Sequence, residues 1–250
     1  MSGFIGTKLT MNLGERSYDI ILKNGALENL YQFARLDRRV AVVTDAGVPA
    51  EYAQRVADQC RDAKIITVPQ GEASKSMKIL ESVLRQMLEF NMGRGDLVIA
   101  VGGGVVGDLA GFAASIYMRG IDFINCPTTT LSMIDSSIGG KTAVDLGETK
   151  NIVGSFWQPK LVIVDPSTLA TLPRRQYING LAESVKASLL ADPELFAIFE
   201  KGDIDEQIGE IIYRSLRFKK SIVEQDETER GMRKACLLYT SPSPRDGLLS

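Results

Sequence analysis

The chain has 250 residues, of which 44% are hydrophobic and 23 are glycine, so it is long and apolar enough to bury one or two ordinary cores. Its 29 basic and 31 acidic residues give a net charge of −2, which excludes a global field that favours nucleic acid or an anionic membrane. Any anion site must therefore be local.

The chain carries no sign of a membrane or secretory segment. No apolar run approaches the roughly 20 residues that span a bilayer, and residues 1–6 lack the charged and apolar regions of a signal peptide. Its three cysteines, Cys60, Cys126 and Cys236, lie far apart without metal-type spacing, which indicates reduced thiols. We therefore expect a cytoplasmic protein with no nucleic acid or membrane partner.

Strand and helix patterns alternate over the first 165 residues, which is typical of a parallel sheet with crossover helices. Pro49 suits the first turn of one such helix, and Ser76 is placed to cap an amphipathic helix at residues 77–88. Apolar or β-branched runs predict an initial antiparallel hairpin and then parallel strands, at residues 7–13 and 17–22, and at 39–44, 64–68, 97–101, 121–126 and 161–164.

The pattern changes in the last third of the chain. Beyond Pro173 only helical patterns remain, at residues 181–190, 194–199 and 208–223, which predicts a second, α-helical domain beginning near residue 166. Residues 237–250 carry Ser-Pro and Asp-Gly pairs but no periodic apolar face. We interpret them as a tail of foreign origin, with a natural disordered C-terminus as the alternative.

A buried strand runs into a glycine-rich turn and then a helix at residues 97–108. Gly102, Gly103, Gly104 and Gly107 lack a Cβ, so a phosphate can approach the main chain and the positive end of the helix. The alternative is that these glycines only permit close packing of strand and helix.

Two further loops are expected at the same carboxyl edge of the sheet. Gly71, Glu72 and Lys75 follow one strand, and Thr128 and Thr129 follow another. The alternatives are that the first group is a solvated loop and that the threonines cap a helix.

A second cluster of polar residues spans 135–142 and continues with Lys150 and Asn151. It combines a carboxylate, hydroxyls, glycines and ammonium groups, which suits a phosphorylated and polyhydroxylated ligand. It is not a P-loop, because Asp135 stands where that motif requires a glycine. Arg119 can join these cations, and a charge-rich surface loop is the alternative.

A third cluster contains Glu183 and Lys186, which share one face of a helix. They form either a surface ion pair or part of a metal site. A catalytic zinc ion usually takes three protein ligands, with histidine prominent among them, and this chain contains no histidine.

Together with residues 180–183, these motifs resemble those of the 3-dehydroquinate synthases, the sugar phosphate cyclases of the shikimate pathway, and the resemblance spans residues 8 to about 235. It implies an α/β fold, in which a Rossmann-like, NAD-binding N-terminal domain with a parallel sheet (1–165) precedes a truncated all-α domain for metal and substrate (166–236). It also implies a homodimer in the full-length family.

The resemblance further implies site residues. Contacts with NAD would come from Asp45, Gly71, Glu72, Lys75, Gly104, Val105, Val106, Gly107, Asp108, Thr128, Thr129, Lys141, Lys150, Thr168, Leu169, Ala170 and Thr171. Residues facing the sugar phosphate would be Arg119, Asp135, Asn151, Lys186, Lys219 and Arg233, and Glu183 would bind Zn²⁺ or Co²⁺.

The reaction that the resemblance implies converts 3-deoxy-D-arabino-heptulosonate 7-phosphate into 3-dehydroquinate and phosphate. NAD would take a hydride from a substrate alcohol, the resulting ketone would acidify the neighbouring C–H, and phosphate would leave. The hydride would then return, the ring would open, and an internal aldol step would close the carbocycle.

The sequence departs from the family after Ala235. The family would continue with an asparagine and a Gly-His pair that supplies a metal ligand, whereas this chain has Cys236 and the Ser-Pro tail. We therefore expect a truncated, inactive synthase fragment that exposes apolar surface on its helical domain. The alternatives are another sugar phosphate cyclase, an iron-dependent alcohol or polyol dehydrogenase, and a protein that only binds the nucleotide.

Overall fold

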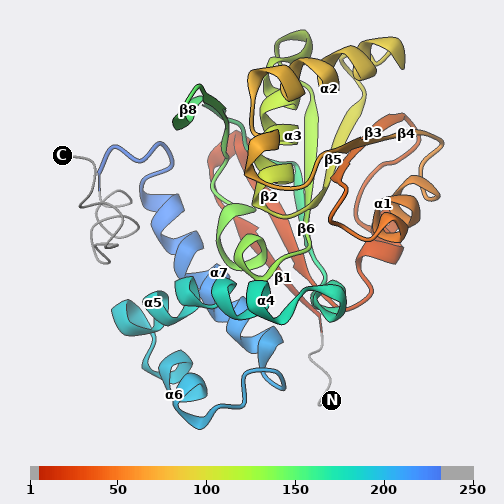
Figure 1. The fold of residues 1–250 in the computed structure, drawn as a ribbon. Helices are drawn as coiled ribbons and strands as arrows, with labels where there is room; N and C mark the ends of the chain where they lie inside the picture. The colour runs from red at the N-terminus through yellow and green to blue at the C-terminus, as the bar shows by residue number, and fades with distance from the viewer. Residues whose placement is uncertain (1–5, 232–250) are drawn as a thin grey trace.

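The computed structural model describes residues 6–231, so the predicted tail at 237–250 and Arg233 lie outside it (Figure 1). The main sheet has seven strands in the order β1-β2-β9-β6-β5-β3-β4. They are β1 (Thr7–Met11), β2 (Tyr18–Leu22), β3 (Arg39–Asp45), β4 (Asp62–Val68), β5 (Leu97–Gly102), β6 (Asp122–Pro127) and β9 (Leu161–Val164). Within the seven-stranded sheet, only the β1–β2 pair is antiparallel. The predicted α/β class is thus confirmed.

The helices follow the predicted order closely. They are α1 (Ala50–Ala57), α2 (Met77–Glu89), α3 (Gly104–Ile116), α4 (Arg174–Gly180), α5 (Ala182–Ala191), α6 (Pro193–Lys201) and α7 (Ile208–Gln225). The Ser76 hydroxyl accepts a hydrogen bond from the Ile79 amide and caps α2, as predicted. The sequence did not predict α4. No helix within residues 6–231 combines the length and apolar character that crossing a bilayer requires.

The strand pleat divides the core between the two faces of the sheet. In β5, Ile99 faces the layer that contains α1, whereas Val98 and Ala100 face α2 and α3. In β9, Ile163 and Val162 alternate in the same way, and Val162 packs with residues of α7. The strand register places Val162 and Ala100 on one face. Helices α3 and α7 therefore stand on the same face of the sheet.

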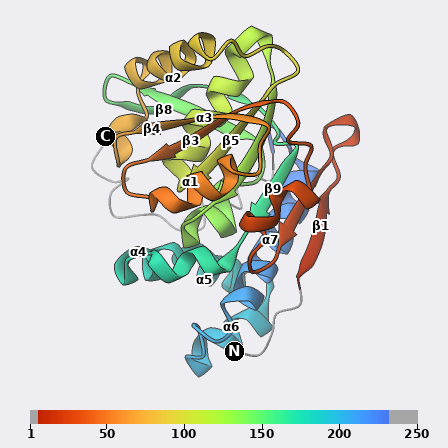
Figure 2. The same ribbon diagram turned by 90° about the vertical axis from the view of Figure 1, so that its right-hand side faces the viewer.

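The helices after β9 share their core with the start of the chain. Met11 and Ile20 of the first hairpin pack in one cluster with Ile211 and Leu216 of α7. The Asn12 amide also donates to Glu224 Oε1 at 2.6 Å. In the turned view of Figure 2, α2 and the group α4 to α6 lie at opposite ends of the molecule. A division into domains at residue 166 stays a prediction.

Two small elements that the sequence did not predict complete the fold. A π-helical turn covers Ser132–Ser136, and a separate antiparallel hairpin consists of β7 (Lys141–Leu146) and β8 (Thr149–Phe156). The hairpin packs on α3, where a Cβ added at Gly111 would lie 2.5 Å from Thr142 Cγ2. Both elements lie beside the region between α3 and α7.

Candidate functional site

A first pocket lies where β3, β5 and β6 end, with a volume of about 240 Å³. Gly71 lines it with a φ of +99°, a conformation that favours glycine. Its lining draws predicted residues from separate loops: Asp45, Gly71, Gly104, Val105, Thr128, Thr129 and Thr171. The parallel sheet thus brings these loops to one edge, which is where such folds bind ligands.

Helix α3 begins at this pocket without a side-chain cap, because Gly103 precedes it. The amide groups of its first turn have no partner within the helix and lie at the pocket wall. A Cβ at Gly104 would lie 2.9 Å from Ser136 Oγ, and one at Gly103 would lie 3.1 Å from Thr129 Cγ2. These two glycines leave a main-chain cradle that suits a pyrophosphate group.

The other two glycines of the turn serve close packing. A Cβ at Gly102 would lie 2.6 Å from Val106 Cγ2, and one at Gly107 would lie 3.1 Å from Asn125 Nδ2. Val106 is fully buried in the core. The close-packing interpretation therefore holds for the glycine run, and phosphate binding at Gly103 and Gly104 stays a prediction.

Polar groups surround the cradle in fixed positions. Asp45 is 9% exposed, and its Oδ1 accepts from the Gly47 amide at 2.7 Å. Thr171 Oγ1 and the Tyr52 hydroxyl are 2.9 Å apart. Thr129 accepts from the Ser132 amide at 3.2 Å, so it caps the next turn while it lines the pocket. The capping role predicted as an alternative is confirmed, and a contact of Thr129 with a cofactor stays a prediction.

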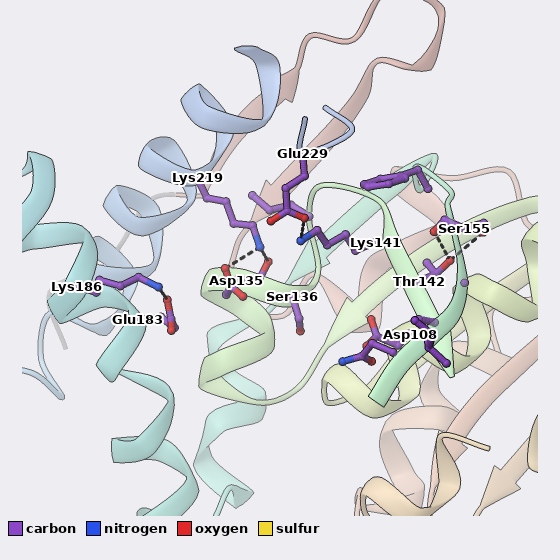
Figure 3. Close-up of a pocket in the computed structure, with 16 residues that line it drawn as sticks. Asp108, Asp135, Ser136, Lys141, Thr142, Ser155, Glu183, Lys186, Lys219 and Glu229 are labelled. Carbon is purple, nitrogen blue, oxygen red and sulfur yellow. Dashed lines mark hydrogen bonds and ion pairs between the residues drawn. The ribbon is translucent and has the colours of Figure 1, made fainter. Parts of the chain in front are cut away.

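A second, larger pocket of about 570 Å³ adjoins the first (Figure 3). Ser136, which closely approaches Gly104 of the first pocket, belongs to its lining. The charged side chains that line it come from α3, the π-helical turn, the β7–β8 hairpin, α5, α7 and the segment after α7: Asp108, Asp135, Lys141, Glu183, Lys186, Lys219 and Glu229. The two pockets therefore share a wall.

Each lysine of this second pocket is paired with a carboxylate (Figure 3). Lys219 Nζ lies 2.7 Å from Asp135 Oδ1, and Lys219 is only 7% exposed. Lys141 pairs with Glu229. Lys186 pairs with Glu183, which was one of the two alternatives predicted from the sequence. Four carboxylates against three lysines leave the lining with one more acidic than basic side chain, so it is not cationic.

The two aspartates of the pocket differ in pKa. Burial alone would raise the pKa of Asp135, but the charges of Lys219, Lys186 and Lys141 outweigh it and hold that pKa below its usual value. Burial raises the pKa of Asp108, and the neighbouring Lys75 offsets this only in part. Asp135 is therefore the firmly ionised acceptor of the pair.

The residues present do not complete a metal site. Glu183 supplies one carboxylate to the pocket, already paired with Lys186. Within residues 6–231 no group of three or more histidine, cysteine, aspartate or glutamate side chains can hold a metal ion. Glu183 as a metal ligand stays a prediction.

Several predicted cofactor contacts lie away from the first pocket. Asp108 and Lys141 line the second pocket instead. Lys150 and Glu72 face each other on the outside, with Nζ and Oε1 3.5 Å apart. Other residues are buried or face solvent elsewhere, with Thr168 and Leu169 inside the turn Pro166–Thr171 and Ala170 exposed on it.

Among the predicted substrate contacts, Asp135, Asn151, Lys186 and Lys219 all line the second pocket. Arg119 does not. It lies exposed beyond the end of α3 opposite to Gly104, a helix of 13 residues and hence about 20 Å long.

Sequence reasoning missed Glu229 and Ser136 as pocket residues. Glu229 lies outside the sequence motifs, and its φ of +58° is uncommon for a residue other than glycine. No local pattern announces this placement. Ser136 was noted only as a hydroxyl within the 135–142 cluster, although its approach to Gly104 joins the two pockets.

The fold and the two pockets define a class of α/β proteins. In this class, a glycine-rich turn at the carboxyl edge of the sheet adjoins a charged pocket that is partly lined by helices. Comparisons with known proteins narrow this class. A 3-dehydroquinate synthase N-terminal model matches residues 65–179, and the corresponding C-terminal model matches residues 180–238.

The relatives agree with these models. The 3-dehydroquinate synthase of Pelobacter propionicus is 41% identical over 238 residues, which covers 90% of this chain and 66% of that protein. Among solved structures, 2-deoxy-scyllo-inosose synthase complexed with carbaglucose-6-phosphate, NAD⁺ and Co²⁺ matches with a TM-score of 0.84 at 26% identity, over 92% of this chain and 67% of that one.

A third relative is 2-epi-5-epi-valiolone synthase from Streptomyces hygroscopicus with NAD⁺ and Zn²⁺ bound, with a TM-score of 0.80 and 31% identity over 90% of this chain and 66% of that one. The chain belongs to the 3-dehydroquinate synthase family. It spans about two thirds of the length of the curated relatives that it matches.

Proposed function

We propose that this chain forms the cofactor and substrate pockets of a 3-dehydroquinate synthase, which converts 3-deoxy-D-arabino-heptulosonate 7-phosphate into 3-dehydroquinate and phosphate. The observation that carries the proposal is the shared wall at Gly104 and Ser136. A dinucleotide seated over the start of α3 would lie directly beside the charged pocket. Membership of the family supports the choice of reaction.

The first pocket would hold NAD. The open amides at Gly104 and Val105 suit the pyrophosphate, and the Asp45 carboxylate is placed to accept from a ribose hydroxyl. When bound, NAD supplies a reversible hydride acceptor for a substrate alcohol.

The second pocket would hold the sugar phosphate. Lys141, Lys186 and Lys219 would bind its anionic groups and stabilise the negative charge of the enolate and of the leaving phosphate. Asp135 and Asn151 would orient substrate hydroxyls, since an ionised carboxylate accepts their protons in hydrogen bonds. A phosphate entering this pocket must compete with the carboxylates that already pair with the lysines.

We propose a bound metal ion only for relatives that are longer than this chain. The solved relatives hold Co²⁺ or Zn²⁺, whereas these 250 residues contain no histidine, and the part of the chain that the structure describes has no three-ligand group. We therefore propose that the 250-residue chain binds NAD and phosphate but does not turn over.

A homodimer is part of the same proposal. Because Arg119 lies beyond the far end of α3, its side chain cannot reach the second pocket of the same chain. A role for Arg119 toward substrate would require the pocket of a second copy.

The test has two parts. Titration calorimetry of the 250-residue chain with NAD should show binding that the substitution Gly104→Val weakens, and lack of binding by the unsubstituted chain would contradict the proposed site. Phosphate release from 3-deoxy-D-arabino-heptulosonate 7-phosphate with NAD and Zn²⁺ should be absent. Turnover at rates typical of enzymes would contradict the inactivity, and NADH accumulating with a polyol would favour a dehydrogenase.

A further inference from the structure

Lys75 is a buried lysine that lines neither of the two main pockets. It follows β4 in the loop that carries Gly71, and it is 5% exposed. It borders a separate cavity of about 320 Å³ between this loop and the turn of the β7–β8 hairpin. A lysine this deeply buried needs partners for its charge, because an unpaired buried ammonium is strongly unfavourable.

The partners of Lys75 come from two other segments. Its Nζ lies 2.7 Å from Asp108 Oδ2 in the first turns of α3. The same Nζ donates to Asn151 Oδ1 in β8. The ammonium group therefore connects the loop after β4, helix α3 and the hairpin.

The backbone adds a second connection at the same place. The Lys75 carbonyl oxygen accepts from the Asp145 amide at 2.8 Å, and Ser76 and Asp145 form an isolated parallel bridge. Asp145 Oδ1 in turn accepts from the Asn151 amide at 2.7 Å. Lys75 thus holds both strands of the hairpin near its turn.

The hairpin needs such an anchor. It has only two strands, stands apart from the main sheet, and its register shifts between Val144 and Leu146. Asn151 has a φ of +54°, an uncommon conformation for a residue other than glycine. Val144, the neighbour of Asp145, packs against residues of α2 and α3, whereas Ile152 in the other strand is 61% exposed. Beyond Val144, the turn end is tied to the loop after β4 by the contacts of Lys75 and Asp145 and by the ion pair of Lys150 with Glu72.

We propose that Lys75 is a positioning residue that fastens the turn of the β7–β8 hairpin to the loop after β4, which carries Gly71. Whether the first pocket is occupied would then determine the position of the hairpin wall of the second pocket. Asn151 and Ile152, which the anchor holds, line that wall. The resemblance to the family implied a direct NAD contact for Lys75, which stays a prediction, and the burial of Lys75 against Asp108 supports the positioning role. The coupling between pockets rests on the proposed function, whereas the anchoring does not.

Hydrogen exchange measured by mass spectrometry on peptides covering 141–156 tests the anchoring. Lys75→Met should speed exchange at residues 145–151 by at least about tenfold, because a hydrogen bond to a charged group is lost. Asn151→Gly removes the amide from the hairpin side and tolerates the positive φ, so it should give the same effect without an unpaired buried carboxylate. Asn151→Asp keeps an acceptor for Lys75 and should retain slow exchange. The matched control is Lys78→Met, an exposed lysine three residues away that should leave exchange unchanged.

Calorimetry with NAD and with inorganic phosphate separates the two roles. Loss of the anchor should weaken phosphate binding several-fold in both Lys75→Met and Asn151→Gly, with a smaller change in NAD affinity. Unchanged hairpin exchange in both variants would overturn the proposal, and a loss of NAD affinity in Lys75→Met with unchanged exchange would establish a direct cofactor contact. If the unsubstituted chain binds neither probe, the proposed function fails while hydrogen exchange still decides the anchoring.

Discussion

The two pockets are built by opposite means. The first consists of strand ends, glycines and main-chain amides, and its shape depends on the absence of side chains at Gly103 and Gly104. The second consists of charged side chains from six segments, each lysine held by a carboxylate. Adding a side chain should block ligand binding in a pocket made of main chain. Removing a charged group should either destabilise a pocket made of side chains or make its remaining charges available to a ligand. The contrast predicts different responses to substitution, salt and pH.

The largest effect is expected at the Lys219–Asp135 pair of the second pocket. Lys219 is buried whereas the Asp135 side chain is 32% exposed, so Lys219→Met leaves a partly buried carboxylate without its nearest cation. The free energy of unfolding should fall by about 2–3 kcal/mol, less than the roughly 3–5 kcal/mol expected for a fully buried pair. Urea unfolding measures this loss. The exposed Lys8 pairs with Asp19 at the surface, and Lys8→Met should cost only about 0.5 kcal/mol. Equal losses in both variants would contradict the contrast.

The next largest effect is expected at the first pocket. The side chain in Gly104→Val would meet Ser136 and cover the open amides, so NAD affinity should fall by about 10- to 100-fold while stability changes less. Gly95→Val is the control, because no atom lies within 4 Å of a Cβ placed there.

Calorimetry at two salt concentrations would also show weaker salt dependence for NAD in the first pocket than for phosphate in the second.

A smaller effect of opposite sign is expected from Glu229. Because Glu229 occupies the ammonium of Lys141, Glu229→Gln should free that lysine and raise the affinity for inorganic phosphate by about three- to tenfold. Glu227→Gln alters a neighbouring carboxylate that pairs with Arg16 instead, and should leave phosphate affinity unchanged. A drop in affinity for the first variant would show that Glu229 helps to shape the pocket.

The smallest effect concerns acid stability. The pKa of Asp135 is lowered in the folded chain, so its contribution to stability is complete above the unfolded pKa of about 3.9 and is lost as pH falls through the lower folded value. The pKa of Asp108 is raised, so its ionisation on raising pH through that value works against folding. Unfolding by urea between pH 3 and 7 should therefore show a shallower loss of stability in acid for Asp135→Asn, and a shallower loss on raising pH for Asp108→Asn.

The same contrast explains what the sequence could predict. The strands, the glycine turn and Gly71 were predictable because glycine and β-branched patterns act over a few neighbouring residues. The gathering of loops at one sheet edge followed from parallel topology alone. Asp135, Asn151, Lys186 and Lys219 were placed by resemblance to a family, and the structure brings them to one pocket.

The remaining features depend on partners distant in sequence. The pairing of Lys141 with Glu229 joins residues far apart, and no local pattern signals it. The β7–β8 hairpin was missed because its polar strands lack the apolar alternation of a buried sheet. The burial of Lys75 could not be deduced from a lysine in a loop. Arg119 lies far from the pocket because the length of α3 separates them.

The contact between Asn12 and Glu224 also bears on how the chain reaches its final form. These residues are 212 positions apart, and the apolar side of the first hairpin shares its core cluster with residues of α7, the last helix within residues 6–231. At ribosomal rates of about 5–20 residues per second, the hairpin must wait roughly ten to forty seconds for its cover. During that interval the earliest segment of the nascent chain is exposed to chaperones and to mispairing, so slowing translation should lower the yield of folded protein.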